Sequence, residues 1–139
     1  MAVGTAISIV QVALSSKLSG DSTLMALVSI IRDQASVAQN QVFPYITIGD
    51  IVETQDDTLS TRQYDQDCTL HIWTQSSGFK QAQGILARCN VLLHRQPLTL
   101  SGSQTHVATW YRDAIPLADP DGITQHLVVH YRLIVEEAI

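Results

Sequence analysis

The chain has 139 residues, of which 45% are hydrophobic, so we expect one folded domain over residues 1–139 and exclude a disordered chain. The net charge of −5, with eight scattered Lys and Arg residues, excludes a surface that coats DNA or RNA, because phosphate binding needs clustered cations. No apolar run approaches the roughly 20 residues of a membrane span, and the N-terminus lacks the basic start of a signal peptide.

Two helices are predicted before any strand. The first covers residues 4–18, where apolar side chains recur at three- and four-residue steps. Gly20 is expected to end this helix with a positive φ, which glycine adopts without steric cost. Asp21 or Ser22 can cap a second, shorter helix that contains Leu24, Leu27 and Val28.

The first hairpin follows an irregular connection over residues 29–41, in which Ile30-Ile31 is the candidate for a short extended piece. Pro44 cannot donate a ladder hydrogen bond, so it marks the start or the edge of a strand. This strand runs to about Glu53 and is expected to bulge at Gly49-Asp50, because glycine inside a strand often marks a bulge.

A polar and acidic connection, TQDDTLST, links this strand to the next one. Its side chains are unsuited to a core, so we expect an exposed end of the hairpin there. The second strand runs from about Gln63 to Thr74, and twelve residues span ~40 Å at ~3.3 Å each. Because that length is large for a small domain, one end of the hairpin is expected to project from the body.

The stretch 66–96 combines the end of this strand with a long amphipathic helix. Apolar and polar side chains alternate over residues 68–74, which is the period of a strand. After Gly78 the apolar period changes to three and four residues, which predicts a helix that ends near Arg95, before Gln96-Pro97. The apolar face of this helix consists of Ala82, Ile85, Leu86, Cys89, Leu92 and Leu93.

A second hairpin closes the chain. Its strands are predicted over residues 106–115 and 126–135, joined by a turn at 118–122, where Pro120 and Gly122 have the backbone preferences that a turn requires. The predicted order is α-α-β-β-α-β-β. This order is typical of an α+β two-layer domain, with a mainly antiparallel four-stranded sheet from two hairpins and helices packed on one face.

Few residues suggest reaction chemistry, and we nominate no catalytic, cofactor-binding or metal-binding residue. His126 and His130 have a helical ligand spacing, but four residues of strand separate them by ~13 Å, so we interpret them as solvated or hydrogen-bonded. Asp121 is interpreted as a turn residue, since the other ligands of a calcium loop do not follow it. Cys68 and Cys89 are interpreted as buried reduced thiols, with a disulfide as the alternative.

Five segments, read in order, resemble one phage family. They are FPYITIG (43–49), CTLHIWT (68–74), GFKQAQ (78–83), LHRQPL (93–98), and DPDG (119–122) leading into HLVVHYR (126–132). The chain resembles the tail-completion, or tail-to-head joining, proteins of long-tailed bacteriophages and related gene-transfer particles. The resemblance covers about residues 1–136, nearly the whole chain.

The resemblance implies a structural virion protein without enzymatic activity or a cofactor. Similar proteins form rings, commonly of six subunits, at the head-proximal end of the tail tube. Such a ring stops tube polymerisation and offers a docking surface to the head connector. The implied partners are therefore other copies of the chain, the tail tube protein and a head-completion or connector protein. DNA passes through without specific binding, and the protein is found in the virion and in the host cytoplasm during assembly.

A closed ring needs two different complementary patches on each subunit. The exposed hairpin end is the candidate for a subunit or tail contact, together with free strand edges. Its residues are Thr54, Gln55, Asp56, Asp57, Thr58 and Leu59. Two alternatives stay open: a head-completion or connector ring subunit, and a small ligand- or metal-binding domain that uses the histidines and Asp121.

Overall fold

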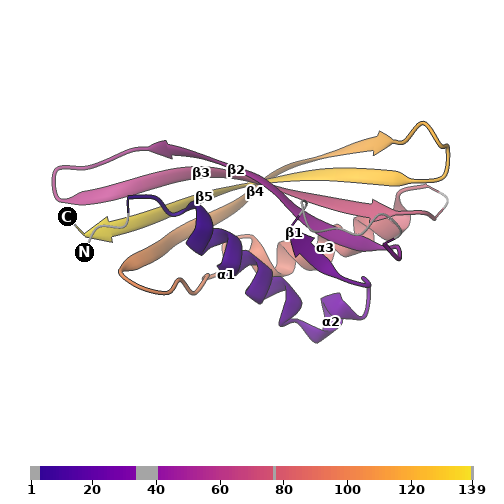
Figure 1. Ribbon diagram of the computed structural model, residues 1–139, viewed down its shortest axis with the longest axis horizontal. Helices are drawn as coiled ribbons and strands as arrows, with labels where there is room; N and C mark the ends of the chain where they lie inside the picture. The colour runs from indigo at the N-terminus through magenta and orange to yellow at the C-terminus, as the bar shows by residue number, and fades with distance from the viewer. Residues whose placement is uncertain (1–3, 34–40, 77, 139) are drawn as a thin grey trace.

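The computed structural model describes residues 4–33, 41–76 and 78–138 and shows one long sheet with helices below it (Figure 1). None of the described helices is long and apolar enough to cross a membrane. In chain order the elements are α1 (Ile7–Ser19), α2 (Ser22–Met25), β1 (Ile31–Asp33), β2 (Tyr45–Gln55), β3 (Thr61–Thr74), α3 (Lys80–Leu93), β4 (Gln104–Ala118) and β5 (Gln125–Ala138).

The sheet has five strands in the order β1-β2-β3-β5-β4. The four long strands are antiparallel neighbours, as the two predicted hairpins require. The prediction of four strands is wrong, because β1 adds a fifth that runs parallel to β2, with Ile31 opposite Ile46. Three residues are too few to show the alternating pattern of a strand. Strand β1 forms because it pairs with the edge of β2 and because Ile31 is buried in the core. The rest of the connection predicted there, residues 34–40, lies outside the described residues.

Strand β2 contains the predicted bulge. Its register with β3 shifts between Ile48 and Ile51, on either side of Gly49-Asp50. Strand β3 alternates between the two faces of the sheet over 14 residues, and every second residue from Tyr64 to Thr74 is buried against the helices. Strand β5 buries the apolar face that the sequence predicts, while Ile134, on the opposite face, is also buried.

The helices all cover the same face of the sheet, as predicted (Figure 1). Helix α3 buries Ala82, Ile85, Cys89 and Leu93, and Cys68 packs into the same core from β3. Both thiols are buried and free, and burial raises the pKa of each to about 12. The interpretation of the cysteines as reduced core residues is therefore confirmed.

Two carboxylates tie the first two helices to the rest of the domain. Glu53 of β2 accepts hydrogen bonds from the backbone N–H of Ala6 (2.9 Å) and the hydroxyl of Thr5 (2.7 Å), which places a negative charge at the positive end of α1. Asp21 accepts a bond from the N–H of Leu24 (2.9 Å) and pairs with Arg88 of α3 (2.8 Å). Arg88 and the capping N–H lower the pKa of Asp21 to about 2.

Gly20 corrects one detail of the sequence-based prediction. Its φ is −79°, so it does not end α1 in the left-handed region. A Cβ atom at this position would lie 2.9 Å from the carbonyl oxygen of Ser16, which is closer than real Cβ contacts. Glycine is therefore favoured here by a close backbone approach.

Candidate assembly interface

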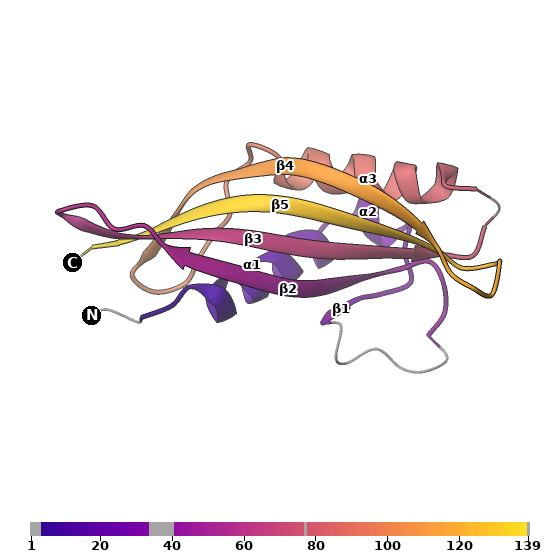
Figure 2. The ribbon, with the colours of Figure 1, turned by 90° about the horizontal axis from the view of Figure 1, so that it is seen from above.

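The turn between β2 and β3 projects at one end of the molecule, beyond the start of α1 (Figures 1 and 2). We call residues 54–60 the hairpin tip. All six side chains that the sequence nominated, Thr54 to Leu59, lie together in it and are exposed. Leu59 is the most exposed large apolar residue of the described chain, at 105%. The structure thus keeps the nominated residues together and leaves them free to meet another molecule.

The hairpin tip is braced by its own side chains. The Asp57 carboxylate accepts bonds from Gln55 Nε2 (3.0 Å) and from the N–H of Gln63 (3.2 Å). The Thr58 hydroxyl oxygen accepts a bond from the N–H of Thr61 (3.0 Å). The Asp56 carboxylate makes no hydrogen bond or ion pair with any described residue, and its charge contributes to raising the pKa of Arg132. The tip therefore holds its shape while it presents one acid that no hydrogen bond engages, Asp56, and one apolar side chain, Leu59.

The face of the sheet opposite the helices has no described helix over it, and Figure 2 looks onto it. Ion pairs cross from strand to strand in the half nearer the hairpin tip. Arg132 binds Asp65 (2.7 Å) and lies over the ring of Trp110, 5.6 Å from its centroid. Arg112 binds Asp67 (2.6 Å). These cations are engaged within the chain, so this half of the open face is neutralised locally.

Histidines and aromatic rings occupy the other half of the open face. His71 Nδ1 and His126 Nε2 are 2.6 Å apart, and the Trp73 ring stacks on His126 with centroids 3.7 Å apart. Partial burial lowers the pKa of both imidazoles, and the pKa of His126, which also faces His71, falls to about 4. The pair is therefore neutral near pH 7, with one ring donating to the other. His130 instead bonds Asp113 (2.5 Å), so the interpretation of His126 and His130 as hydrogen-bonded strand residues is confirmed.

The free edge of β4 is partly covered by the connection that follows α3. The N–H of Tyr111 donates to His94 Nδ1 (2.9 Å), and the N–H of Arg95 donates to the carbonyl oxygen of Thr109 (2.7 Å). Arg95 has a φ of +57° and is the one non-glycine residue with positive φ in the described ranges. A left-handed residue with a side chain costs about 1 kcal/mol or more, which these backbone bonds offset. The backbone of Arg95 is thereby held at a defined place on the edge.

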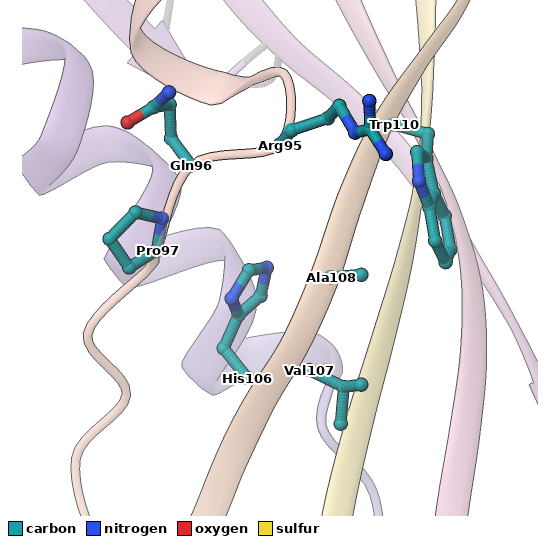
Figure 3. A pocket seen from close by; sticks show the side chains of 7 residues that line it. All are labelled: Arg95, Gln96, Pro97, His106, Val107, Ala108 and Trp110. Atoms are coloured by element: carbon teal, nitrogen blue, oxygen red, sulfur yellow. The ribbon is translucent and has the colours of Figure 1, made fainter.

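A pocket of about 360 Å³ lies between this connection and β4. We call it the β4-edge pocket (Figure 3). It is lined by Arg95, Gln96, Pro97, His106, Val107, Ala108 and Trp110. This lining contains one guanidinium, an exposed apolar wall and no carboxylate. Arg95 makes no side-chain hydrogen bond or ion pair with any described residue, and Figure 3 shows its side chain extending over β4 toward Trp110. The pocket therefore suits an acidic group beside an apolar one.

Sequence reasoning did not find this pocket. Its residues come from the connection after α3 and from β4, at least nine positions apart, and in the sequence Gln96-Pro97 indicates only the end of a helix. The ion pairs of the open face also join residues 45 to 67 positions apart. Proximity of this kind follows from strand pairing, which no local pattern encodes.

Comparisons with known proteins point to one kind of protein. The model of a family described as tail completion protein gp17 matches residues 12–136. A chain of the virion of the native gene transfer agent (GTA) particle aligns with 97% of this chain and 99% of its own length, with a TM-score of 0.84 and 21% identity. The gp17 protein of bacteriophage SPP1 aligns with 92% of this chain and 89% of its own, with a TM-score of 0.57 and 24% identity. At these identities the two structures show a shared fold. No curated protein matches the chain in sequence.

Proposed function

The chain belongs to the tail completion protein gp17 family, and from that premise we propose that it is a ring-forming structural subunit of a phage or phage-like tail. The ring sits at the head-proximal end of the tail tube, ends tube polymerisation and joins the tail to the head connector. Its partners are further copies of this chain, the tail tube protein and a head-completion or connector protein. The observation that carries the proposal is the family match over residues 12–136.

The distribution of unpartnered groups supports an assembly role. The hairpin tip and the β4 edge lie at different places on the sheet and carry different chemistry, as the two patches of a head-to-tail contact must. Both are solvent-exposed. A single domain with two unlike patches is the minimal building block of a closed ring.

A non-enzymatic role is consistent with the surroundings of the histidines and Asp121, whose side chains make hydrogen bonds within the fold. His126 bonds His71, and His130 bonds Asp113, so the two do not converge on one point. Asp121 is engaged within its own turn. Among the described residues no three His, Cys, Asp or Glu side chains are grouped as metal ligands would be. In the part of the chain that the structure describes, the histidines and Asp121 therefore form no shared site that would support the alternative of a ligand- or metal-binding domain built on them.

The charge arrangement suits a channel through which DNA passes without sticking. The net charge is −5, and like charge disfavours adhesion to phosphates. Arg112 and Arg132 on the open face are already paired with Asp67 and Asp65, so they are not free cations for a nucleic acid backbone. We therefore propose no specific nucleic-acid site.

The test is to add the purified protein to polymerising tail tube protein and to measure tube lengths by electron microscopy. We expect shorter tubes with a ring at one end, and rings of about six subunits by native mass spectrometry. Tubes of unchanged length, with the protein bound only to head connectors, would favour the head-completion alternative. A protein that forms no ring, alone or on tube ends, would overturn the proposal.

A further inference from the structure

We propose that the hairpin tip of one copy docks into the β4-edge pocket of the next copy. The Asp56 carboxylate then binds the Arg95 guanidinium, and the Leu59 side chain packs against Pro97 and Val107. This inference rests on the ring assembly proposed above and identifies its two complementary patches.

The hairpin tip offers a prepared surface. The side chains of Asp57 and Thr58 make hydrogen bonds that stabilise the turn, so they are not the groups that we expect to bind another molecule. Asp56 and Leu59 are exposed and three positions apart, and neither is needed to hold the turn together. The Leu59 side chain is 105% exposed, so only contact with a second molecule can bury it. Such burial of apolar area is favourable.

The β4-edge pocket offers the matching groups. Arg88, Arg112 and Arg132 each have an acidic partner. Arg95, like Arg32 and Arg62, has none among the described residues, and it is the arginine that lines the pocket. Pro97 is exposed, and Val107 is 49% exposed on a bulge of β4. An Arg–carboxylate contact adds both energy and geometric specificity to an interface, and Arg is enriched among the residues that dominate binding.

The topology requires the contact to join two copies. The pocket lies on β4, an edge of the sheet, while the hairpin tip joins β2 and β3, and β5 separates β3 from β4. A patch at one place that fits a different patch elsewhere repeats from copy to copy, and the chain of copies closes into a ring when the rotation between neighbours closes. Because each copy carries a net charge of −5, a local pairing of acid with cation selects this contact over random ones.

Disulfide trapping tests the contact directly. A chain with Leu59→Cys is mixed with a chain with Val107→Cys, and the mixture is oxidised and run on a non-reducing gel. The native Cys68 and Cys89 are buried with raised pKa values, so they remain unreactive in the folded protein. We expect a cross-linked dimer. The matched control pairs Leu59→Cys with Val12→Cys, which is 64% exposed on α1, and should give none.

Charge exchange provides the second measurement. Asp56→Lys and Arg95→Glu are each expected to weaken self-association by about tenfold or more, and the double variant should recover most of the loss. Arg95→Gln, which removes the charge and keeps a polar side chain, should weaken association in the same direction and guards against misfolding of Arg95→Glu. Circular dichroism and a urea melt establish that each variant is folded.

The outcomes separate this inference from the proposed function. Rings that form without the Leu59–Val107 cross-link, and that tolerate both charge reversals, would overturn the docking proposal and leave the ring function standing. Wild-type chains that form no ring, even on tube ends, would overturn both. Equal cross-linking of the Val12 control would likewise count against a specific contact.

Discussion

The two hairpin turns of this sheet are both acidic, and each is braced by one of its carboxylates, Asp121 in the β4–β5 turn and Asp57 in the hairpin tip. The hairpin tip carries a further carboxylate, Asp56, which braces nothing. The two turns lie at opposite ends of the molecule (Figure 1). In the β4–β5 turn, Asp121 accepts bonds from the N–H of Ile123 (2.9 Å), the N–H of Thr124 (2.8 Å) and the Thr124 hydroxyl (2.7 Å). These bonds lower the pKa of Asp121. In the hairpin tip, Asp56 has no such partners. A carboxylate that accepts hydrogen bonds within its own turn has a structural role, whereas a carboxylate without such bonds is available to bind another molecule.

The buried threonine of the β4–β5 turn gives the largest expected effect. Thr124 is 5% exposed, donates to Asp121 and accepts from Gln75 Nε2 (3.2 Å). Thr124→Val keeps the shape but leaves these partners without their hydrogen bonds, so the free energy of unfolding should fall by about 1–3 kcal/mol. The matched variant Thr58→Val, in the exposed hairpin tip, should cost less than about 1 kcal/mol because water replaces its bonds. Urea denaturation measures both, and equal losses would contradict the comparison.

The exposed apolar residues of the two turns are expected to differ in self-association and not in stability. Leu59→Ser should change the free energy of unfolding by less than about 0.5 kcal/mol, because the side chain makes no contact within the chain. It should nevertheless weaken self-association by about tenfold, since the proposed anchor is lost. Ile123→Ser, at a residue 59% exposed in the β4–β5 turn, should leave both quantities unchanged. Sedimentation velocity measures association, and loss of assembly in Ile123→Ser alone would reverse the roles of the turns.

A smaller effect is expected from pH, at the histidine pair near the β4–β5 end. The folded-state pKa of His126 is about 4, below the ordinary 6.5, so the unfolded chain binds more protons between these values. The contribution of His126 to the free energy of unfolding is therefore fully present above pH 6.5 and decreases as the pH falls toward 4. Because the ring is only partly buried, solvent screening reduces the loss to about 1 kcal/mol. His126→Phe, which keeps the stacking on Trp73, should remove this part of the pH dependence in urea melts. An unchanged slope would show that the pair does not control it.

Much of the architecture could be predicted from local patterns. The apolar face of α3, the alternation of β3 and β5, the bulge at Gly49-Asp50 and the turn at 118–122 all follow from residues within a few positions of one another. The exposure of Thr54 to Leu59 was likewise predictable, because the segment contains too little apolar area to be buried. The role of these six residues in assembly stays a prediction.

Other features depended on contacts that local patterns do not encode. Strand β1 has three residues and exists through its pairing with β2. Gly20 is required by a neighbouring carbonyl group and not by its φ. The left-handed Arg95 is held by Thr109, which lies 14 positions further along the chain. In each case the decisive partner is supplied by the folded structure.

The sequence by itself determined the α+β class, the covered and open faces of the sheet and the acidic, exposed hairpin tip, because hydrophobic periodicity and turn chemistry act over short distances. Only the tertiary structure decided which charges are neutralised and which are left over. In the folded sheet Asp65 pairs with Arg132 and Asp67 pairs with Arg112, whereas Asp56 and Arg95 make no ion pair with any described residue. Unpaired charges are a property of the whole fold, because whether a charge has a partner depends on every segment that reaches it.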